Sequence, residues 1–364
     1  MHSSRRGFLK RAGAIGAMAA LGGLKTVGAE VKPTKPAGQE RKGLARGLTL
    51  LTMRRNGEYR LGAKTSKGIL DVKEAAGFLK LYSPATLDDM LQREEGASVQ
   101  AVVEAAMQSN AMQRLFLKEE NIEYGPLVTR PEKIVCVGLN YRKHAQEIKM
   151  PIPKQPVLFN KYNNSLLQHA GTLKLPSAVA TKFDYEIELV IVMGKEARDV
   201  SEKDALACVA GYATGNDFSA RDLQFETGGQ WMQGKSSDGF APLGPYFVTA
   251  EQVDPDNLNL ECRVNGETRQ SSNTSDLIYN CSQIISYTSA RISLRPGDII
   301  FTGTPGGVIF GAWSATSYRC QLLPHMWYAS TTCLIFALRR ASSCWPTTSR
   351  TRRPVTTCAT WRNG

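Results

Sequence analysis

The chain has 364 residues, 42% of them hydrophobic and 21% charged, which suits a globular protein and excludes fibrous and largely disordered ones. The net charge of +12 comes from the two ends, because residues 1–46 hold ten basic and two acidic residues and residues 312–364 hold seven arginines and no acid. The chain between them has 28 basic and 31 acidic residues, so no nucleic-acid-binding surface is predicted.

The N-terminal segment has the pattern of an export signal. The pair Arg5-Arg6 precedes an apolar Ala- and Gly-rich run over residues 12–24 and a small-residue cleavage pattern at residues 27–29. This resembles a twin-arginine signal peptide over residues 1–29 and predicts export to the periplasm by the twin-arginine translocase; an ordinary basic tail is the alternative. The run is shorter than the roughly 20 residues of a membrane span, so we expect removal. Residues 30–46, rich in Pro, Gly and Lys, are interpreted as a linker.

Residues 47–125 are predicted to form a small α+β domain. Asn56-Gly57 lies between two apolar segments, which is a strong signal for a β-hairpin. Thr86 has the pattern of a helix N-cap, and apolar residues at helical spacing continue as far as Met107. We find no chemical motif in this segment.

Residues 126–311 consist of short apolar runs separated by Gly, Pro and Asn. This sequence pattern favours a β-rich barrel or roll over a doubly wound sheet. Asn265-Gly266 predicts a further hairpin. The predicted strands fall at residues 134–137, 157–159, 187–193, 246–248, 258–264 and 299–301.

Four cysteines are spread singly through the same part of the chain, without the spacing of a metal site. In an exported protein they raise the possibility of disulfides, but we interpret them as small buried apolar side chains. They are Cys136, Cys208, Cys262 and Cys281.

Three carboxylates are candidates for a metal site. Glu186 and Glu188 lie two residues apart at the start of a predicted strand, where they share one face. Like charges so close need water or a cation, so a solvated strand face is the alternative. Asp217 follows an apolar, glycine-bounded run and adds a third carboxylate. Three carboxylates suit Mg²⁺ or Mn²⁺, with Ca²⁺ as a further candidate, and the lack of a His or Cys cluster disfavours zinc.

The chain also contains five ordered blocks, which are GLNYRKHAQE at 138–147, FDYEIEL at 183–189, GNDFSARDLQ at 215–224, QGKS at 233–236 and TGTPGGV at 302–308. Their order and spacing resemble the fumarylacetoacetate hydrolase family, over about residues 45–311. The resemblance implies a β-rich α+β fold with a mixed β-roll, a homodimer, and Mg²⁺ or Mn²⁺ at Glu186, Glu188 and Asp217. It also implies a small 2-oxo acid, dicarboxylate or β-diketone substrate that reacts through a metal-bound enolate.

Further site residues follow from the same resemblance. Lys235 would add a positive charge near the substrate oxygens, with an ordinary surface lysine as the alternative. His144 and Glu147, three residues apart on a short lid helix, would activate a water, with a structural histidine as the alternative. Positions expected to contact substrate oxygens are Lys161, Arg221, Gln224 and Thr304.

These residues predict an enzyme that either hydrolyses a C–C bond in an acylpyruvate- or fumarylacetoacetate-like substrate, or decarboxylates or isomerises a 2-hydroxymuconate-type compound. The alternative is an impaired homologue that binds metal and a small dicarboxylate without turnover. This alternative is suggested by residues 312–364, which lack Asp, Glu and Lys and hold four of the eight cysteines. We interpret this tail as a frame-shifted reading of the gene's end, with a divergent extension as the alternative.

Overall fold

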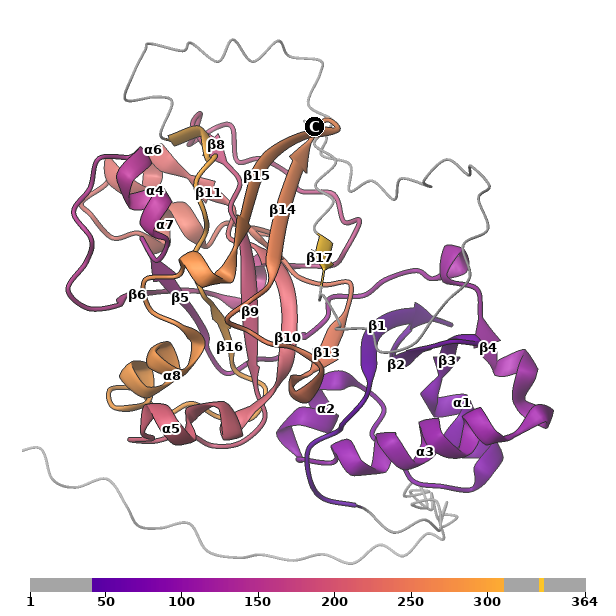
Figure 1. Cartoon of the computed structure of the whole chain (residues 1–364). Coiled ribbons are helices and arrows are strands. Elements are labelled where there is room, and N and C mark those ends of the chain that lie inside the picture. Colours follow the sequence, from indigo (N-terminus) through magenta and orange to yellow (C-terminus); the bar gives the residue numbers. More distant parts are fainter. Residues whose placement is uncertain (1–40, 311–333, 337–364) are drawn as a thin grey trace, which may run out of the picture. The chain divides into compact units, whose positions relative to one another are not determined.

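A computed structural model of the chain describes residues 41–310 and 334–336 (Figure 1). The predicted signal peptide, residues 30–40 of the predicted linker and nearly all of the C-terminal tail lie outside the described residues. Export, cleavage and the frame shift therefore stay predictions. Among the helices of the described part, none is both long and apolar enough to span a bilayer.

A ten-stranded mixed sheet organises the fold, in the order β4-β3-β2-β1-β13-β10-β9-β16-β5-β6. All neighbours in it are antiparallel except β16 and β5. Its strands are β1 (Thr49–Arg55), β2 (Glu58–Thr65), β3 (Gly68–Asp71), β4 (Phe116–Leu117), β5 (Ile134–Gly138), β6 (Val157–Lys161), β9 (Ile187–Met193), β10 (Val209–Asn216), β13 (Phe247–Thr249) and β16 (Ile299–Phe301).

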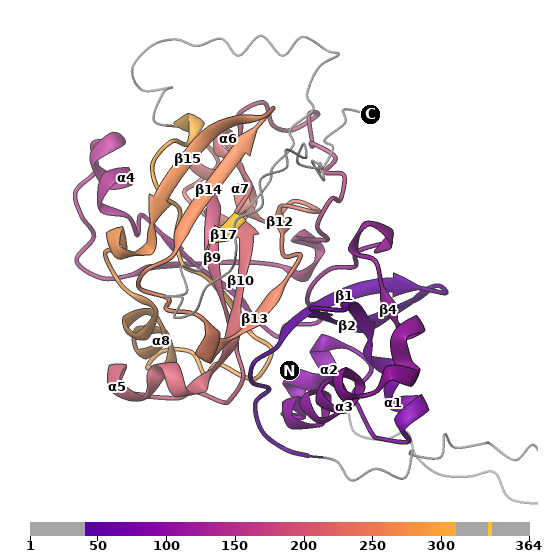
Figure 2. The same cartoon turned by 45° about the vertical axis from the view of Figure 1, so that its right-hand side comes forward.

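The rest of the described part includes smaller sheets, eight α-helices and six short 3₁₀-helices. In Figures 1 and 2, α1 to α3 cover β1 to β3, and α5 and α8 lie side by side at one end of β9 and β10, with α4, α6 and α7 at the other end. The small sheets are β8 (Phe183–Asp184) with β11 (Ser219–Ala220), β7 (Leu166–Leu167) with β12 (Ala241–Pro242), and β15 (Glu267–Asn273) with β14 (Asn259–Val264) and β17 (Leu334–Phe336). The helices are α1 (Val72–Leu79), α2 (Leu87–Gln92), α3 (Gly96–Gln108), α4 (Arg142–Glu147), α5 (Glu202–Ala205), α6 (Arg221–Phe225), α7 (Met232–Lys235) and α8 (Cys281–Ser289).

Both predicted hairpins are confirmed. In the first, Arg55 of β1 pairs with Glu58 of β2, and the two residues between them, Asn56 and Gly57, have φ of 54° and 77°. A two-residue turn of this type needs positive φ at both positions, which Asn and Gly tolerate. Asn265 and Gly266 repeat the arrangement between β14 and β15.

The predicted helical stretch after Thr86 is two helices rather than one. Thr86 caps α2 as expected, since its hydroxyl accepts a hydrogen bond from the Asp89 backbone N–H. The helix then ends at Gln92, and Glu94 takes a positive φ of 55° before α3 begins at Gly96. A Cβ at Gly96 would lie 2.1 Å from the Ala45 nitrogen, so a close approach of two backbones sets the break.

The central strand β9 is buried on both faces. Val190 and Val192 belong to one hydrophobic cluster, whereas Leu189 and Ile191 belong to another that includes residues of α8. A strand that is buried on both faces needs apolar side chains at successive positions, which explains the apolar run over residues 189–193 of β9. The four described cysteines are buried and unbridged, as predicted.

The sheet also runs through both predicted domains. Strand β1 pairs with β13, with Leu50 opposite Phe247. Residues from the 47–125 segment and from the 126–311 segment therefore share one sheet, and the division near residue 125 stays a prediction.

Candidate active site

Strands β9 and β10 bring the three carboxylates together. Glu186 directly precedes β9, Glu188 is its second residue and Asp217 directly follows β10. The antiparallel pairing sets these two ends side by side, with the Asp217 N–H donating to the Glu186 carbonyl over 2.9 Å. One oxygen from each carboxylate lies within 4.8 Å of the others. Their exposed fractions are 6%, 2% and 1%, so the alternative of a solvated strand face is wrong.

Three buried cations, Lys161, Arg221 and Lys235, neutralise part of this charge. Lys235 Nζ lies 2.6 Å from Glu186 Oε2 and 2.7 Å from Asp217 Oδ2. Arg221 Nη2 lies 2.6 Å from Glu186 Oε1 and 2.7 Å from Asp184 Oδ2. Burial opposes the charge on Glu186, but Lys235 and Arg221 outweigh it and lower its pKa to about 2. Burial likewise opposes the charge on Lys235, whose pKa is nevertheless raised by Asp217 and Glu186.

Glu188 is the least compensated of the three carboxylates. Its Oε2 accepts a hydrogen bond from the Gly303 N–H at 2.7 Å, and no cationic side chain of the described chain forms an ion pair with it. Its pKa is raised well above the ordinary value, because it is buried and lies near the charges of Asp217 and Glu186. A cluster of hard oxygen donors with uncompensated negative charge fits a divalent cation such as Mg²⁺, Mn²⁺ or Ca²⁺.

The carboxylates lie in a cleft of about 490 Å³, including its open mouth. Most of the predicted site residues contribute to its lining, although they come from five separate segments of the chain. Those that line it are His144, Glu186, Glu188, Asp217, Arg221, Gln224, Lys235 and Thr304.

His144 and Glu147 form a pair on α4. His144 Nδ1 lies 3.4 Å from Glu147 Oε2, and both Glu147 oxygens lie 3.1 Å from the Gly307 nitrogen, whose N–H they accept. The hydrogen bonds from His144 and Gly307 lower the pKa of Glu147, although its partial burial opposes them. With Nδ1 facing Glu147, the Nε2 atom of His144 has no hydrogen-bond partner among the described residues and can exchange a proton with a bound molecule.

Lys161 and Thr304 are engaged within the protein. Lys161 does not belong to the cleft lining in the described chain; its fully buried ammonium lies 2.5 Å from Asp217 Oδ1. The Thr304 hydroxyl donates to the Ile187 carbonyl and accepts from the Gln270 amide. Lys161 therefore forms an ion pair with Asp217, a candidate metal ligand. Substrate contacts for Lys161 and Thr304 stay predictions.

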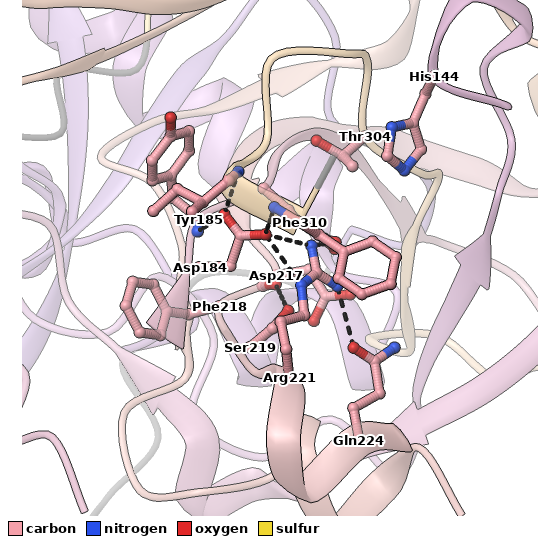
Figure 3. A network of polar contacts seen from close by, with 12 residues as sticks. His144, Asp184, Tyr185, Asp217, Phe218, Ser219, Arg221, Gln224, Thr304 and Phe310 are labelled. Atoms are coloured by element: carbon pink, nitrogen blue, oxygen red, sulfur yellow. Dashed lines mark hydrogen bonds and ion pairs between the residues drawn. The ribbon is translucent and has the colours of Figure 1, made fainter. Parts of the chain in front are cut away.

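Asp184 is a site residue that sequence reasoning did not single out. Its Oδ2 accepts from Arg221 Nε and Nη2 and from the Phe310 N–H, and its Oδ1 accepts from the Ile309 N–H (Figure 3). Arg221 Nη1 in turn donates to Gln224 Oε1 over 3.0 Å. Asp184 thus ties α6 to the segment after β16. The sequence did contain a signal for this residue, because Asp184 lies two residues before Glu186 and so continues the spacing of Glu186 and Glu188.

The sequence around this site matches a known protein family. A family model described as Fumarylacetoacetate (FAA) hydrolase C-terminal matches residues 133–329, more than half of the chain. This chain belongs to the fumarylacetoacetate hydrolase family. The match extends past Gly311, beyond the point at which the resemblance was expected to end.

Relatives within the family carry different names. A fumarylacetoacetate hydrolase domain-containing protein 2 homolog of Dictyostelium discoideum is 47% identical over 190 residues, which are 50% of this chain and 62% of the relative. The chain thus spans less than two thirds of that protein. A mitochondrial oxaloacetate tautomerase of Rattus norvegicus is 39% identical over 232 residues, 63% of this chain and 73% of the relative.

A solved structure of the family has the same fold. The fumarylacetoacetate hydrolase of Exiguobacterium antarcticum superposes with a TM-score of 0.62 at 27% identity, covering 79% of this chain and 95% of that one. The β-rich, mixed fold predicted from the sequence is confirmed. The names of these relatives identify the family as one of enzymes, comprising hydrolases and tautomerases.

Proposed function

We propose that this chain is a divalent-metal-dependent enzyme that acts on 2-oxo acids. The observation that carries the proposal is the buried triad of Glu186, Glu188 and Asp217, which lines a cleft together with the ammonium of Lys235. A divalent ion held by the triad would act as a Lewis acid that polarises the keto oxygen of the substrate. Lys235 adds a fixed positive charge beside the same carboxylates, where negative charge develops when a C–C or C–H bond next to the keto group breaks.

His144 is the proton-transfer group in this proposal. Its Nδ1 faces Glu147, which orients the ring. Its Nε2 takes a proton from a water, whose oxygen bonds to the acyl carbon while the C–C bond breaks and the leaving enolate takes up a proton. Alternatively, Nε2 takes a proton from the carbon next to the keto group, and the keto oxygen takes up a proton to give the enol. The first outcome is C–C hydrolysis and the second is tautomerisation. The relative named as an oxaloacetate tautomerase supports the second, and the pairing with Glu147 suits both.

Replacing His144 with alanine should separate C–C hydrolysis from decarboxylation. We expect hydrolysis of acylpyruvates to fall by about 100-fold, because the three carboxylates that share the cleft with His144 are the proposed metal ligands. Decarboxylation needs no such base and should be spared. The measurement is the initial rate of pyruvate release from acetylpyruvate compared with that of CO₂ release from oxaloacetate. An equal loss of both rates would contradict the role given to His144.

The proposed function is tested with acylpyruvates, oxaloacetate and fumarylacetoacetate, with and without Mg²⁺ or Mn²⁺. We expect metal-dependent turnover of at least one of them and its loss in Glu186→Gln. A cooperative thermal transition must accompany each measurement, because it shows that the chain is folded. If the folded protein binds these compounds but turns none of them over, it is instead the impaired homologue.

A further inference from the structure

One side of the cleft is an aromatic wall that the proposed reaction does not use. Its rings contact one another: Phe159 and Trp231 have centroids 5.4 Å apart, Trp231 and Phe225 5.9 Å, and Phe225 and Phe310 5.0 Å with planes inclined by 26°. Linked rings of this kind form a continuous apolar surface. The aromatic wall is defined as Phe159, Phe225, Trp231 and Phe310, all of which line the cleft.

The wall is held in place yet open to the cleft. A Cβ on Gly138 would lie 2.4 Å from the Trp231 ring, so the absence of a side chain at that position lets the indole lie against the backbone. Phe310 is anchored by the hydrogen bond from its N–H to Asp184. Phe225 is 42% exposed, and Met150, which also lines the cleft, is 45% exposed. Exposed apolar surface in a cleft marks a site for an apolar group.

The cations of the cleft are already committed to protein carboxylates. Arg221 donates to Asp184, Glu186 and Gln224, and Lys235 donates to Glu186 and Asp217. Besides these two and the His144 ring, the cleft lining within the described residues contains no basic side chain. Lys235 Nζ lies 5.2 Å from the Phe159 ring centroid and Arg221 Cζ 5.3 Å from that of Phe310, but both cations donate to protein groups. A second carboxylate on a substrate would therefore lose its hydration against the wall and have to compete with Asp184, Glu186 and Asp217 for these donors, which is costly.

We propose that the aromatic wall binds the tail of the substrate, and that the preferred substrate is a 2-oxo acid with an apolar or aromatic acyl tail. The inference rests on the proposed function and narrows its substrate class. Oxaloacetate, for which a relative is named, carries a carboxylate where this chain presents the wall. This chain therefore prefers an acylpyruvate such as benzoylpyruvate to oxaloacetate.

The test compares benzoylpyruvate with oxaloacetate on the full chain with Mn²⁺, by calorimetric Kd and by kcat/KM. We expect benzoylpyruvate to bind at least about tenfold more tightly. Trp231→Ala should weaken benzoylpyruvate binding by about tenfold or more, with a smaller change for oxaloacetate, so that the ratio of the two Kd values falls. Phe225→Ala should lower the ratio in the same direction, which guards against misfolding of one variant. Phe78→Ala removes a 49% exposed ring of α1 outside the cleft and should leave the ratio unchanged.

The outcomes separate this inference from the proposed function. Tighter binding of oxaloacetate, or an unchanged ratio in both folded wall variants, would overturn the wall's role even if turnover is observed. Absence of turnover in folded, Mn²⁺-loaded protein would contradict the proposed function, while the Kd ratio would still decide what the wall binds.

Discussion

Replacing Lys235 with methionine is expected to lower the free energy of unfolding by about 3 kcal/mol in metal-free buffer. Lys235 is 2% exposed, and its ammonium lies between Glu186 and Asp217, so its removal leaves two buried carboxylates each short of one cation. Breaking a buried pair in this way costs about 3–5 kcal/mol. The low end applies because Arg221 still pairs with Glu186 and Lys161 with Asp217.

Urea denaturation of the two proteins measures this loss, and Mn²⁺ should recover part of it, because an ion bound only by the folded state stabilises that state. The matched control is Lys182→Met, which removes a lysine that is 47% exposed and pairs with Glu226 on the surface. A surface pair contributes about 0–1 kcal/mol. Equal effects of the two substitutions would show that the carboxylates around Lys235 are not both charged.

Replacing Glu188 with glutamine should change stability and activity in opposite directions. The amide still accepts the Gly303 N–H, but it removes a buried negative charge that has no cationic partner among the described residues. Removing this unfavourable buried charge should stabilise the metal-free protein by about 0.5–2 kcal/mol. Metal-dependent turnover should fall by at least about 10³-fold, because a ligand of an ion that contributes several kcal/mol to charge stabilisation is lost.

Thermal unfolding at neutral pH with chelator, and turnover with saturating Mn²⁺, test the two parts of this prediction. Glu226→Gln serves as control, since Glu226 is 59% exposed and its neutralisation should alter neither quantity appreciably. A lower melting temperature for Glu188→Gln would mean that Glu188 is already neutral or better paired in the folded protein. Retained turnover would remove Glu188 from the metal site.

Several strands and both hairpins were predictable because their signals are local, whereas β10 (Val209–Asn216) was not among the predicted strands. Strand β9 occupies residues 187–193 and β16 residues 299–301, the bounds that their apolar runs predicted. Asn56-Gly57 and Asn265-Gly266 determine their turns through the backbone angles that they tolerate. The break between α2 and α3 was missed, since it depends on the approach of Ala45 to Gly96, two residues far apart in the chain.

For the site, the sequence alone determined which carboxylates share a strand face and, through the order of its motif blocks, which family they belong to. Only the tertiary structure decided their electrostatic partners. Lys235 meets Glu186 across 49 positions of the chain, and Lys161 lies against Asp217 rather than in the cleft. Side-chain alternation is set by the backbone of each strand, whereas burial, charge pairing and the aromatic wall arise when separate segments pack together, and no local pattern encodes that packing.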